Sequence, residues 1–160
     1  MAKPSAPDIN RFLNRAIRLA AGSAASGGGP FGALVVTADG RVHEGVNRVT
    51  RDNDPTAHAE VVAIRTAAAA SANFDLSGAV LYASCEPCPL CLAAALWARV
   101  GSVHFAADRH AAAAAGFDDA LFYEYFGGTR PELMPVLQTA VPASDVPFQA
   151  WRDNTDRTEY

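Results

Sequence analysis

The sequence predicts a protein of the α/β class, in which helices cover both faces of a central sheet. Two observations lead to this prediction. Segments with apolar residues at helical spacing alternate with short apolar segments typical of strands, in the expected order α-β-β-α-β-α-β. The chain has 160 residues, which is enough for one domain with a substantial core. We therefore expect a single domain over 1–160, with a sheet sandwiched between helices.

A helix and a hairpin open the chain. Apolar residues recur at helical spacing from Asp8, the expected N-cap, and the glycine-rich segment 26–30 ends this helix. Residues 31–47 read as two strands joined at Asp39-Gly40, a dipeptide that favours tight hairpin turns. The segment 48–56 that follows is polar and rich in turn residues.

The remaining elements alternate in type. Residues 57–70 favour a helix, with Asp54 or Thr56 as its cap. The further expected elements are a buried strand at 79–84, a helix from Pro89 that Gly101 ends, a strand at 102–107, helical pieces within 108–126, a last strand at 135–141 and a terminal helix with a tail within 147–160.

Composition excludes several classes of function. The formal net charge is −4 and no segment is rich in lysine or arginine, which argues against a nucleic-acid binder. No apolar run is long enough to cross a bilayer, and the N-terminus lacks the apolar stretch of a secretory signal. Three cysteines clustered within residues 85–91 cannot staple distant segments, so we expect a soluble protein of the reducing cytoplasm.

Two of the three cysteines are candidate metal ligands. Pro89 is suited to the first position of a helix, which makes Cys88 its N-cap and places Cys91 in its first turn. The positive end of a helix stabilises thiolates and so favours metal binding. Cys85 ends an apolar strand, where a cysteine usually packs as a small hydrophobe.

A third ligand comes from the histidines. His43, His104 and His110 lie in strands or beside an alanine run and are expected to be structural or solvated. His58 opens a helix, and Glu60 follows two residues later. One imidazole and two thiolates leave the fourth position of a zinc ion open, as in catalytic zinc sites, and Glu60 is placed to move protons there.

These motifs resemble a known family. HxE at 58–60 followed by PCxxC at 87–91 is similar to the signature of zinc-dependent nucleobase and nucleoside deaminases. Within that superfamily the chain is most similar to bacterial guanine deaminases, through the sequences GGPFGA, NDPTAHAE, SCEPCP, WAR, AGFDD and PFQAWR. The resemblance implies a cytidine deaminase-like fold, a three-layer α-β-α sandwich with a central mixed sheet of five strands.

The resemblance also implies roles for individual residues. One zinc ion per subunit would be held by His58, Cys88 and Cys91, with Glu60 and Asp119 as catalytic residues. The residues implied in substrate binding are Asn47, Phe31, Trp97, Asp119 and Tyr160. The implied assembly is a homodimer, and the tail at about 143–160 would close over the active site, exchanged between subunits.

The implied reaction is hydrolysis of guanine to xanthine and ammonia. Water attacks C2, while Glu60 protonates a ring nitrogen and then the leaving amine. Neither nucleic acid nor membrane is an expected partner. The nearest alternative is a deaminase of another base or nucleoside, namely cytosine, guanosine, an aminated triazine or tRNA adenosine. The second alternative is a structural zinc module without catalysis, in which Cys85 closes the fourth metal position.

Overall fold

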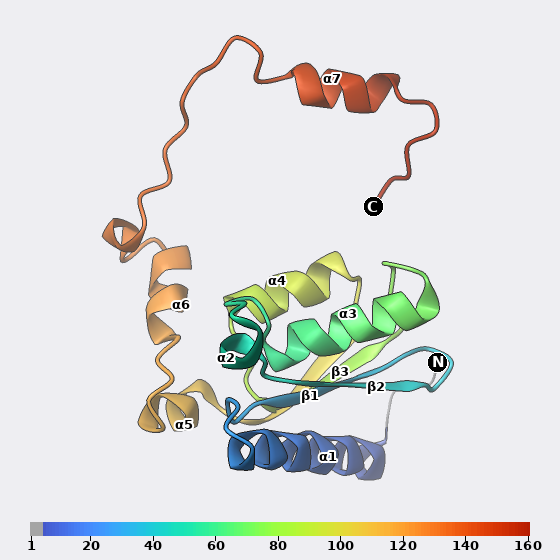
Figure 1. The fold of residues 1–160 in the computed structure, drawn as a ribbon, viewed down its shortest axis with the longest axis vertical. Helices are drawn as coiled ribbons and strands as arrows, with labels where there is room; N and C mark the ends of the chain where they lie inside the picture. Colours follow the sequence, from blue (N-terminus) through green and yellow to red (C-terminus); the bar gives the residue numbers. More distant parts are fainter. Residues whose placement is uncertain (1–4) are drawn as a thin grey trace. The chain divides into compact units, whose positions relative to one another are not determined.

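The computed structural model describes residues 5–160 and divides the chain into two compact units, Met1–Tyr123 and Glu124–Tyr160. The first unit contains the sheet and most of the helices (Figure 1). Its elements are α1 (Ala6–Ala25), β1 (Gly32–Val36), β2 (Val42–Val46), α2 (Val49–Asp52), α3 (Ala59–Ser71), β3 (Val80–Cys85), α4 (Pro89–Trp97), β4 (Ser102–Ala107), α5 (Arg109–Ala114) and the start of α6 (Ala120–Phe126). The second unit holds the end of α6, a 3₁₀ turn η1 (Pro131–Leu133) and α7 (Val146–Asp153).

The sheet is mixed, as predicted. Its strand order is β2-β1-β3-β4. Strand β1 is antiparallel to both β2 and β3, whereas β3 and β4 are parallel. The first hairpin turns through Gly40 in the left-handed region (φ 86°), at the predicted Asp39-Gly40 turn. The parallel pair places the ends of β3 and β4 at the same edge of the sheet.

Alternation along the strands divides the core into two layers. Ala33, Val35 and Leu81 point to the face covered by α3 and α4, while Leu34 and Tyr82 point to the face covered by α1 (Figure 1). Side chains two apart in a strand share a face, so both faces of β1 and β3 are buried. The predicted three-layer α-β-α arrangement is therefore confirmed for the first unit.

The prediction of a fifth strand is wrong. Residues 135–141 have no regular structure, and every one of them is exposed. Their apolar content resembles a strand, but a strand is stable only when a neighbour satisfies its backbone and covers its side chains. No strand in the described part of the chain pairs with this segment, and the sheet has four strands.

Several predicted helix boundaries also shift. Helix α1 begins two residues before the predicted cap Asp8, with Ser5 at the N-cap position. Helix α3 begins only after His58, because Asp54 and Thr56 form a separate turn before it. Helix α4 ends at Trp97 rather than at Gly101, and the backbone reverses at Arg99 in the left-handed region (φ 59°). The polar segment after β2 contains the short helix α2, which the sequence did not predict.

Within residues 5–160, the helices are too short or too polar for any of them to cross a bilayer.

Helix α3 packs unusually close to the sheet at Gly45 of β2. A Cβ atom added at Gly45 would lie 2.1 Å from the carbonyl oxygen of Ala59 and 2.5 Å from the backbone nitrogen of Ala63. Both are backbone atoms of α3, so no side-chain rotation can relieve the clash. Since α3 carries the predicted site residues His58 and Glu60 at its start, Gly45 fixes how near they come to the sheet.

We expect Gly45→Ala to lower the free energy of unfolding by about 1–3 kcal/mol, the usual cost of overpacking a core. Chemical denaturation measures the change. Gly22→Ala is the matched control, because Gly22 lies inside α1 with nothing within 4 Å of an added Cβ. That control should gain about 0.5–1 kcal/mol from helix propensity. Equal effects of the two substitutions would contradict the close approach at Gly45.

Candidate active site

Two helices begin at the same place in the first unit. His58 is the N-cap of α3, and Cys88 is the N-cap of α4 with Pro89 in its first turn. The predicted position of Cys88 is thus confirmed, and Cys91 lies in the first turn of the same helix. Both caps have extended backbone, so their side chains project off the helix starts and not along the helix sides. The two helices pack on each other, which brings the three side chains together.

His58, Cys88 and Cys91 form a tight triangle of donor atoms. The Sγ atoms of Cys88 and Cys91 are 3.6 Å apart, and His58 Nδ1 lies 3.6 Å and 3.5 Å from them. For zinc at its usual bond lengths, tetrahedral ligands are separated by about 3.8 Å between sulfurs and about 3.6 Å between sulfur and nitrogen. The donor set and its spacing therefore fit one zinc ion, with both sulfurs buried and the imidazole half-buried.

The surroundings of Cys88 and Cys91 shift the pKa values of the two side chains in opposite directions. The two sulfur atoms contact each other at 3.6 Å, and the contacts with Cys91 and His58 lower the pKa of Cys88 well below its usual value. The contact with Cys88, together with burial, raises the pKa of Cys91. Because zinc takes both sulfurs as thiolates, its binding displaces any proton that remains on the pair.

Glu60 lies beside this triangle in the first turn of α3. Its side chain is buried at 7% exposure, and the loss of water raises the pKa of its carboxyl group. A carboxyl group with a raised pKa can both accept and return a proton near neutral pH. Glu60 is not one of the three metal donors. Its position is therefore that of a proton carrier beside the metal.

A cavity of about 490 Å³ opens next to the metal donors. Of the predicted site residues, it is lined by His58, Cys88, Glu60, Asn47, Phe31 and Asp119. The glycine-rich loop 27–29 and Phe117 also line it, and the sequence analysis did not select them. Phe117 lies in the AGFDD stretch and packs edge-on against Phe31 with ring centroids 4.9 Å apart, which makes one wall aromatic.

Asn47 presents a fixed amide to the cavity. Its Oδ1 accepts a hydrogen bond from the backbone N–H of Val49 (3.2 Å), so its Nδ2 is left to donate. Gly29 allows this arrangement, because a Cβ at that position would lie 2.8 Å from the Asn47 Cγ. Asn47 therefore offers a hydrogen-bond donor to whatever binds in the cavity.

Asp119 offers a hydrogen-bond acceptor to the cavity, whereas Asn47 offers a donor. Its Oδ1 atom is buried and has no hydrogen-bond partner among the described residues. Burial, with the Cys88 charge as a second cause, raises the pKa of the Asp119 carboxyl group. An unpaired buried acceptor costs free energy unless a ligand pairs with it. The cavity thus has a donor at Asn47 and an unsatisfied acceptor at Asp119.

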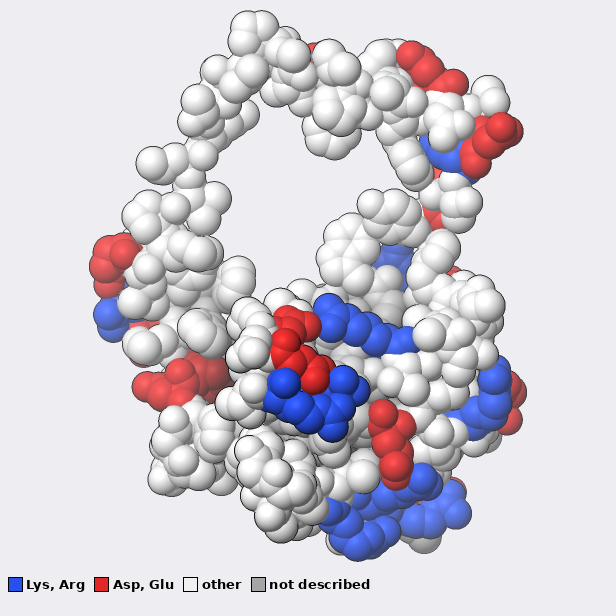
Figure 2. Space-filling view, in the orientation of Figure 1, with Lys and Arg blue, Asp and Glu red and all other residues white. Residues whose placement is uncertain are grey.

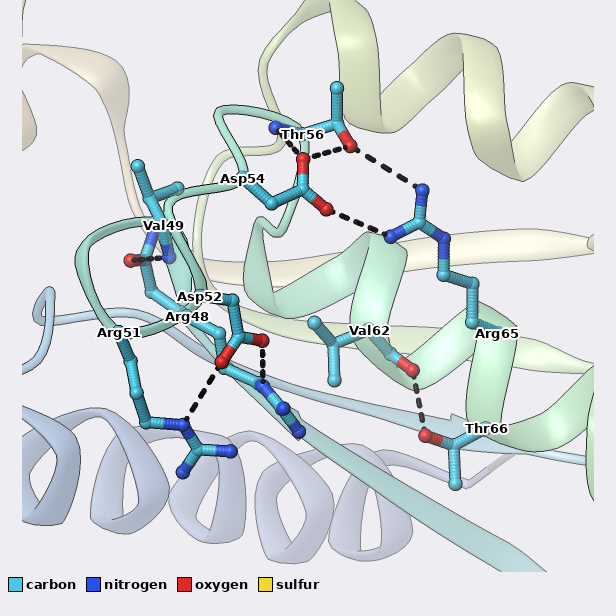
Figure 3. A network of polar contacts seen from close by, with 10 residues as sticks. Arg48, Val49, Arg51, Asp52, Asp54, Thr56, Val62, Arg65 and Thr66 are labelled. Atoms are coloured by element: carbon cyan, nitrogen blue, oxygen red, sulfur yellow. Dashed lines mark hydrogen bonds and ion pairs between the residues drawn. The ribbon is translucent and has the colours of Figure 1, made fainter.

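A network of polar contacts holds the loop between Asn47 and His58 (Figure 3). Asp54 Oδ1 accepts bonds from the backbone N–H and the hydroxyl of Thr56, while Arg65 of α3 reaches back to both residues. The backbone N–H of Arg48 donates to the carbonyl of Ala57 at 2.9 Å. This bond links the two ends of the loop. The positions of Asn47, at the cavity, and of His58, at the metal donors, therefore depend on each other.

Trp97 and Tyr160 are the remaining predicted site residues. Trp97 is the last residue of α4, about 13.5 Å along the helix from Cys88 at the usual rise of ~1.5 Å per residue. It is 65% exposed and is not among the described residues that line the cavity. Tyr160 belongs to the second unit, where its ring contacts Trp151. The substrate contacts of both residues stay predictions.

Cys85 stays apart from the metal donors. It ends β3, is buried, and contacts the carbonyl oxygen of Asp108 through its sulfur at 3.5 Å. Among the described residues, the atoms close enough to hold one metal ion come from His58, Cys88 and Cys91 without Cys85. The three-donor geometry is that of an open zinc site, as the sequence predicted for catalysis.

Comparison with known families also indicates that the chain binds zinc. Residues 7–107, more than half of the chain, match the family described as the cytidine and deoxycytidylate deaminase zinc-binding region. The chain belongs to this family of zinc-binding deaminases.

Individual relatives cover more of the chain. A guanine deaminase of Bacillus subtilis is 46% identical over 151 residues, covering 93% of this chain and 97% of the relative. A crystal structure of a guanine deaminase from that species superposes with a TM-score of 0.89, covering 94% of this chain and 98% of the other. A guanine deaminase from Nitrosomonas europaea is 33% identical with a TM-score of 0.63, covering 68% of this chain and 63% of the other.

Deaminases with another substrate match a shorter part. A tRNA-specific adenosine deaminase of Haemophilus influenzae is 36% identical over 116 residues, covering 68% of this chain and 66% of the relative. The likeness to the Bacillus subtilis enzyme thus extends further along the chain.

We expect Cys88→Ser and Cys91→Ser each to lower zinc affinity by at least 10-fold, because each removes one of only three donors. Competition with a chromogenic chelator measures the affinity. Cys85→Ser is the matched control and should keep both zinc stoichiometry and activity. If Cys85→Ser lost zinc and unfolded, the site would be the closed structural module that the sequence left as an alternative.

Proposed function

We propose that this protein is an enzyme that hydrolyses guanine to xanthine and ammonia. The observation that carries the proposal is the pairing of an oriented donor at Asn47 with the buried, unpaired acceptor at Asp119, across a cavity that adjoins the zinc donors. Guanine presents the complementary groups, since O6 and N7 accept hydrogen bonds and the 2-amino group donates them. The near-complete likeness to the Bacillus subtilis guanine deaminase supports the same substrate.

Recognition in this proposal uses both edges of the base. Asn47 Nδ2 donates to an acceptor of guanine, and Asp119 accepts from the 2-amino group. The aromatic wall of Phe31 and Phe117 covers the ring. Adenine lacks the 2-amino group, so it would leave the buried acceptor of Asp119 unpaired.

Glu60 is the proton carrier in the proposed mechanism. Bound zinc would lower the pKa of a water molecule, so that a nucleophile is available near neutral pH. Glu60 accepts a proton from the attacking water and passes it to a ring nitrogen of guanine as the water oxygen bonds to C2. It then takes the second proton from the hydroxyl group at C2 and delivers it to the exocyclic amine, whose bond to C2 breaks, which yields xanthine and ammonia. Burial of Glu60 raises the pKa of its carboxyl group and so strengthens the carboxylate as a base toward the attacking water.

Among the described residues beside the cavity, the two arginines nearest to its edge are paired with an acidic residue. The cavity is bordered by Val49 and Thr50, next to Arg48 and Arg51. Both arginines form ion pairs with Asp52, and Figure 2 shows basic side chains beside acidic ones at several places on this face. An RNA loop needs unpaired cations and exposed aromatic stacking surfaces. A free nucleobase needs neither, which favours guanine over an anticodon loop.

We also propose a homodimer that exchanges the tail at about 143–160, and residence in the reducing cytoplasm. Many large apolar side chains of the second unit are exposed within it, among them Phe126, Leu137 and Phe148, and such surfaces commonly mark interfaces. The mass of the protein in solution decides the assembly.

The three cysteines are free thiols, and a thiolate metal site persists only where they are not oxidised to disulfides.

Zinc-loaded protein should release ammonia from guanine with kcat/KM at least ~10⁴-fold higher than from adenine, because unpaired polar groups penalise the wrong base. A coupled ammonia assay over guanine, guanosine, adenine, cytosine, aminated triazines and a tRNA anticodon stem-loop measures this ratio. No xanthine from guanine near neutral pH, or faster deamination of the stem-loop, would refute the proposed substrate.

Substitution Glu60→Gln should lower kcat by about 10²–10⁴-fold, since the amide cannot carry a proton. Zinc stoichiometry should stay that of the wild type, because Glu60 is not a metal donor. Glu44→Gln, an exposed carboxylate on β2, is the control and should keep full activity. A Glu60→Gln protein that keeps both zinc and turnover would exclude Glu60 as the proton carrier.

A further inference from the structure

Three side chains form a closed set of contacts next to the metal donor Cys88, and one of them, Glu86, also lines the cavity. The guanidinium of Arg109 pairs with both carboxylate oxygens of Glu86, and the backbone N–H of Arg109 donates to Glu86 Oε2 at 3.0 Å. The same guanidinium lies over the ring of Tyr123, 3.5 Å from its centroid. The Tyr123 hydroxyl donates to the carbonyl oxygen of Pro87 at 2.9 Å. We call Glu86, Arg109 and Tyr123 the clamp.

The clamp joins two segments that meet in the active site. Glu86 and Pro87 directly precede the metal donor Cys88. Arg109 begins α5 and Tyr123 lies in α6, so these two residues bracket the segment that carries Phe117 and Asp119 to the cavity wall. No side chain of the clamp needs to touch the substrate in order to act on it.

We propose that Arg109 is a positioning residue, which through Glu86 and Tyr123 sets the Asp119 wall of the cavity relative to the metal donor Cys88. The inference rests on the proposed function, because Asp119 acts there as the acceptor for the 2-amino group. It goes further by assigning a role to three residues that are not among the metal donors.

The physical basis is the planarity of the guanidinium. One flat group can pair with a carboxylate through two N–H donors at its edge and stack on an aromatic ring with its face. Both contacts then fix its orientation. The pair is also partly shielded from water, with side-chain exposures of 29% for Arg109 and 17% for Glu86, so it is screened less than a surface ion pair.

The test uses two substitutions that weaken different contacts of the clamp. Arg109→Lys keeps the charge but loses the two-donor pairing and the flat stack. Tyr123→Phe keeps the ring under the guanidinium but loses the bond to Pro87. The control is Arg15→Lys, since Arg15 forms a comparable ion pair with Glu44 (2.6 Å) on the sheet, with side-chain exposures of 43% and 39%.

We expect each clamp substitution to lower kcat for guanine by about 10- to 100-fold, the range seen when partners of metal ligands are removed. KM should change by less than about threefold, because the base still meets Asn47 and Asp119, while a small misplacement of the reacting carbon from the metal is costly. Zinc content and Tm should stay near those of the wild type. Arg15→Lys should match the wild type in every measurement.

The double variant Arg109→Lys/Tyr123→Phe separates positioning from simple structural support. If the clamp acts as one unit, the double variant loses no more kcat than the worse single variant. The proposal would be overturned if the fold-losses of kcat of the two single variants multiplied in the double variant, or if kcat did not change. It would also be overturned if kcat fell only together with Tm or zinc content. Wild-type protein that releases no ammonia from guanine would instead refute the proposed function, and the same variants would then be measured with whichever base the wild type deaminates.

Discussion

The start of α3 and the start of α4 meet at one point, and the rest of the site depends on that meeting. The contact of His58 with Cys88 and Cys91 requires that both helices follow strands of one sheet and pack on the same face of it. Gly45 lets α3 approach the sheet backbone, and Pro89 begins α4 immediately after the first sulfur ligand. The metal donors and Glu60 therefore arise from two helix N-termini and not from a dedicated loop.

Charge around these helix starts suits a neutral base. Two thiolates offset the charge of a zinc ion, and helix N-termini stabilise them. Glu60 and Asp119 are both buried enough to have raised pKa values. Such carboxyl groups exchange protons with a ligand at little cost, whereas exposed carboxylates would stay ionised. A site of this kind favours an uncharged, polar substrate over a phosphate-bearing one.

The sequence predicted those features of the fold, such as helix caps and turns, that depend on residues adjacent in the chain. Pro89 predicted that Cys88 would cap a helix, and Asp39-Gly40 predicted the hairpin, since both are set by backbone preferences of adjacent positions. The spacing of His58 and Glu60 predicted the other half of the metal site. The strand expected at 135–141 failed because apolar composition cannot supply the neighbouring strand that pairing needs. Phe117 was missed because its contact with Phe31 joins segments more than eighty residues apart.

The most direct test of the account is a crystal structure of the zinc-loaded Glu60→Gln protein with guanine bound. The account predicts zinc held by His58, Cys88 and Cys91, and the base lying between Asn47 and Asp119. It predicts hydrogen bonds of about 2.7–3.2 Å from Asn47 Nδ2 to a guanine acceptor and from the 2-amino group to Asp119. Guanine bound with its 2-amino group turned away from Asp119, or zinc held by Cys85, would contradict it.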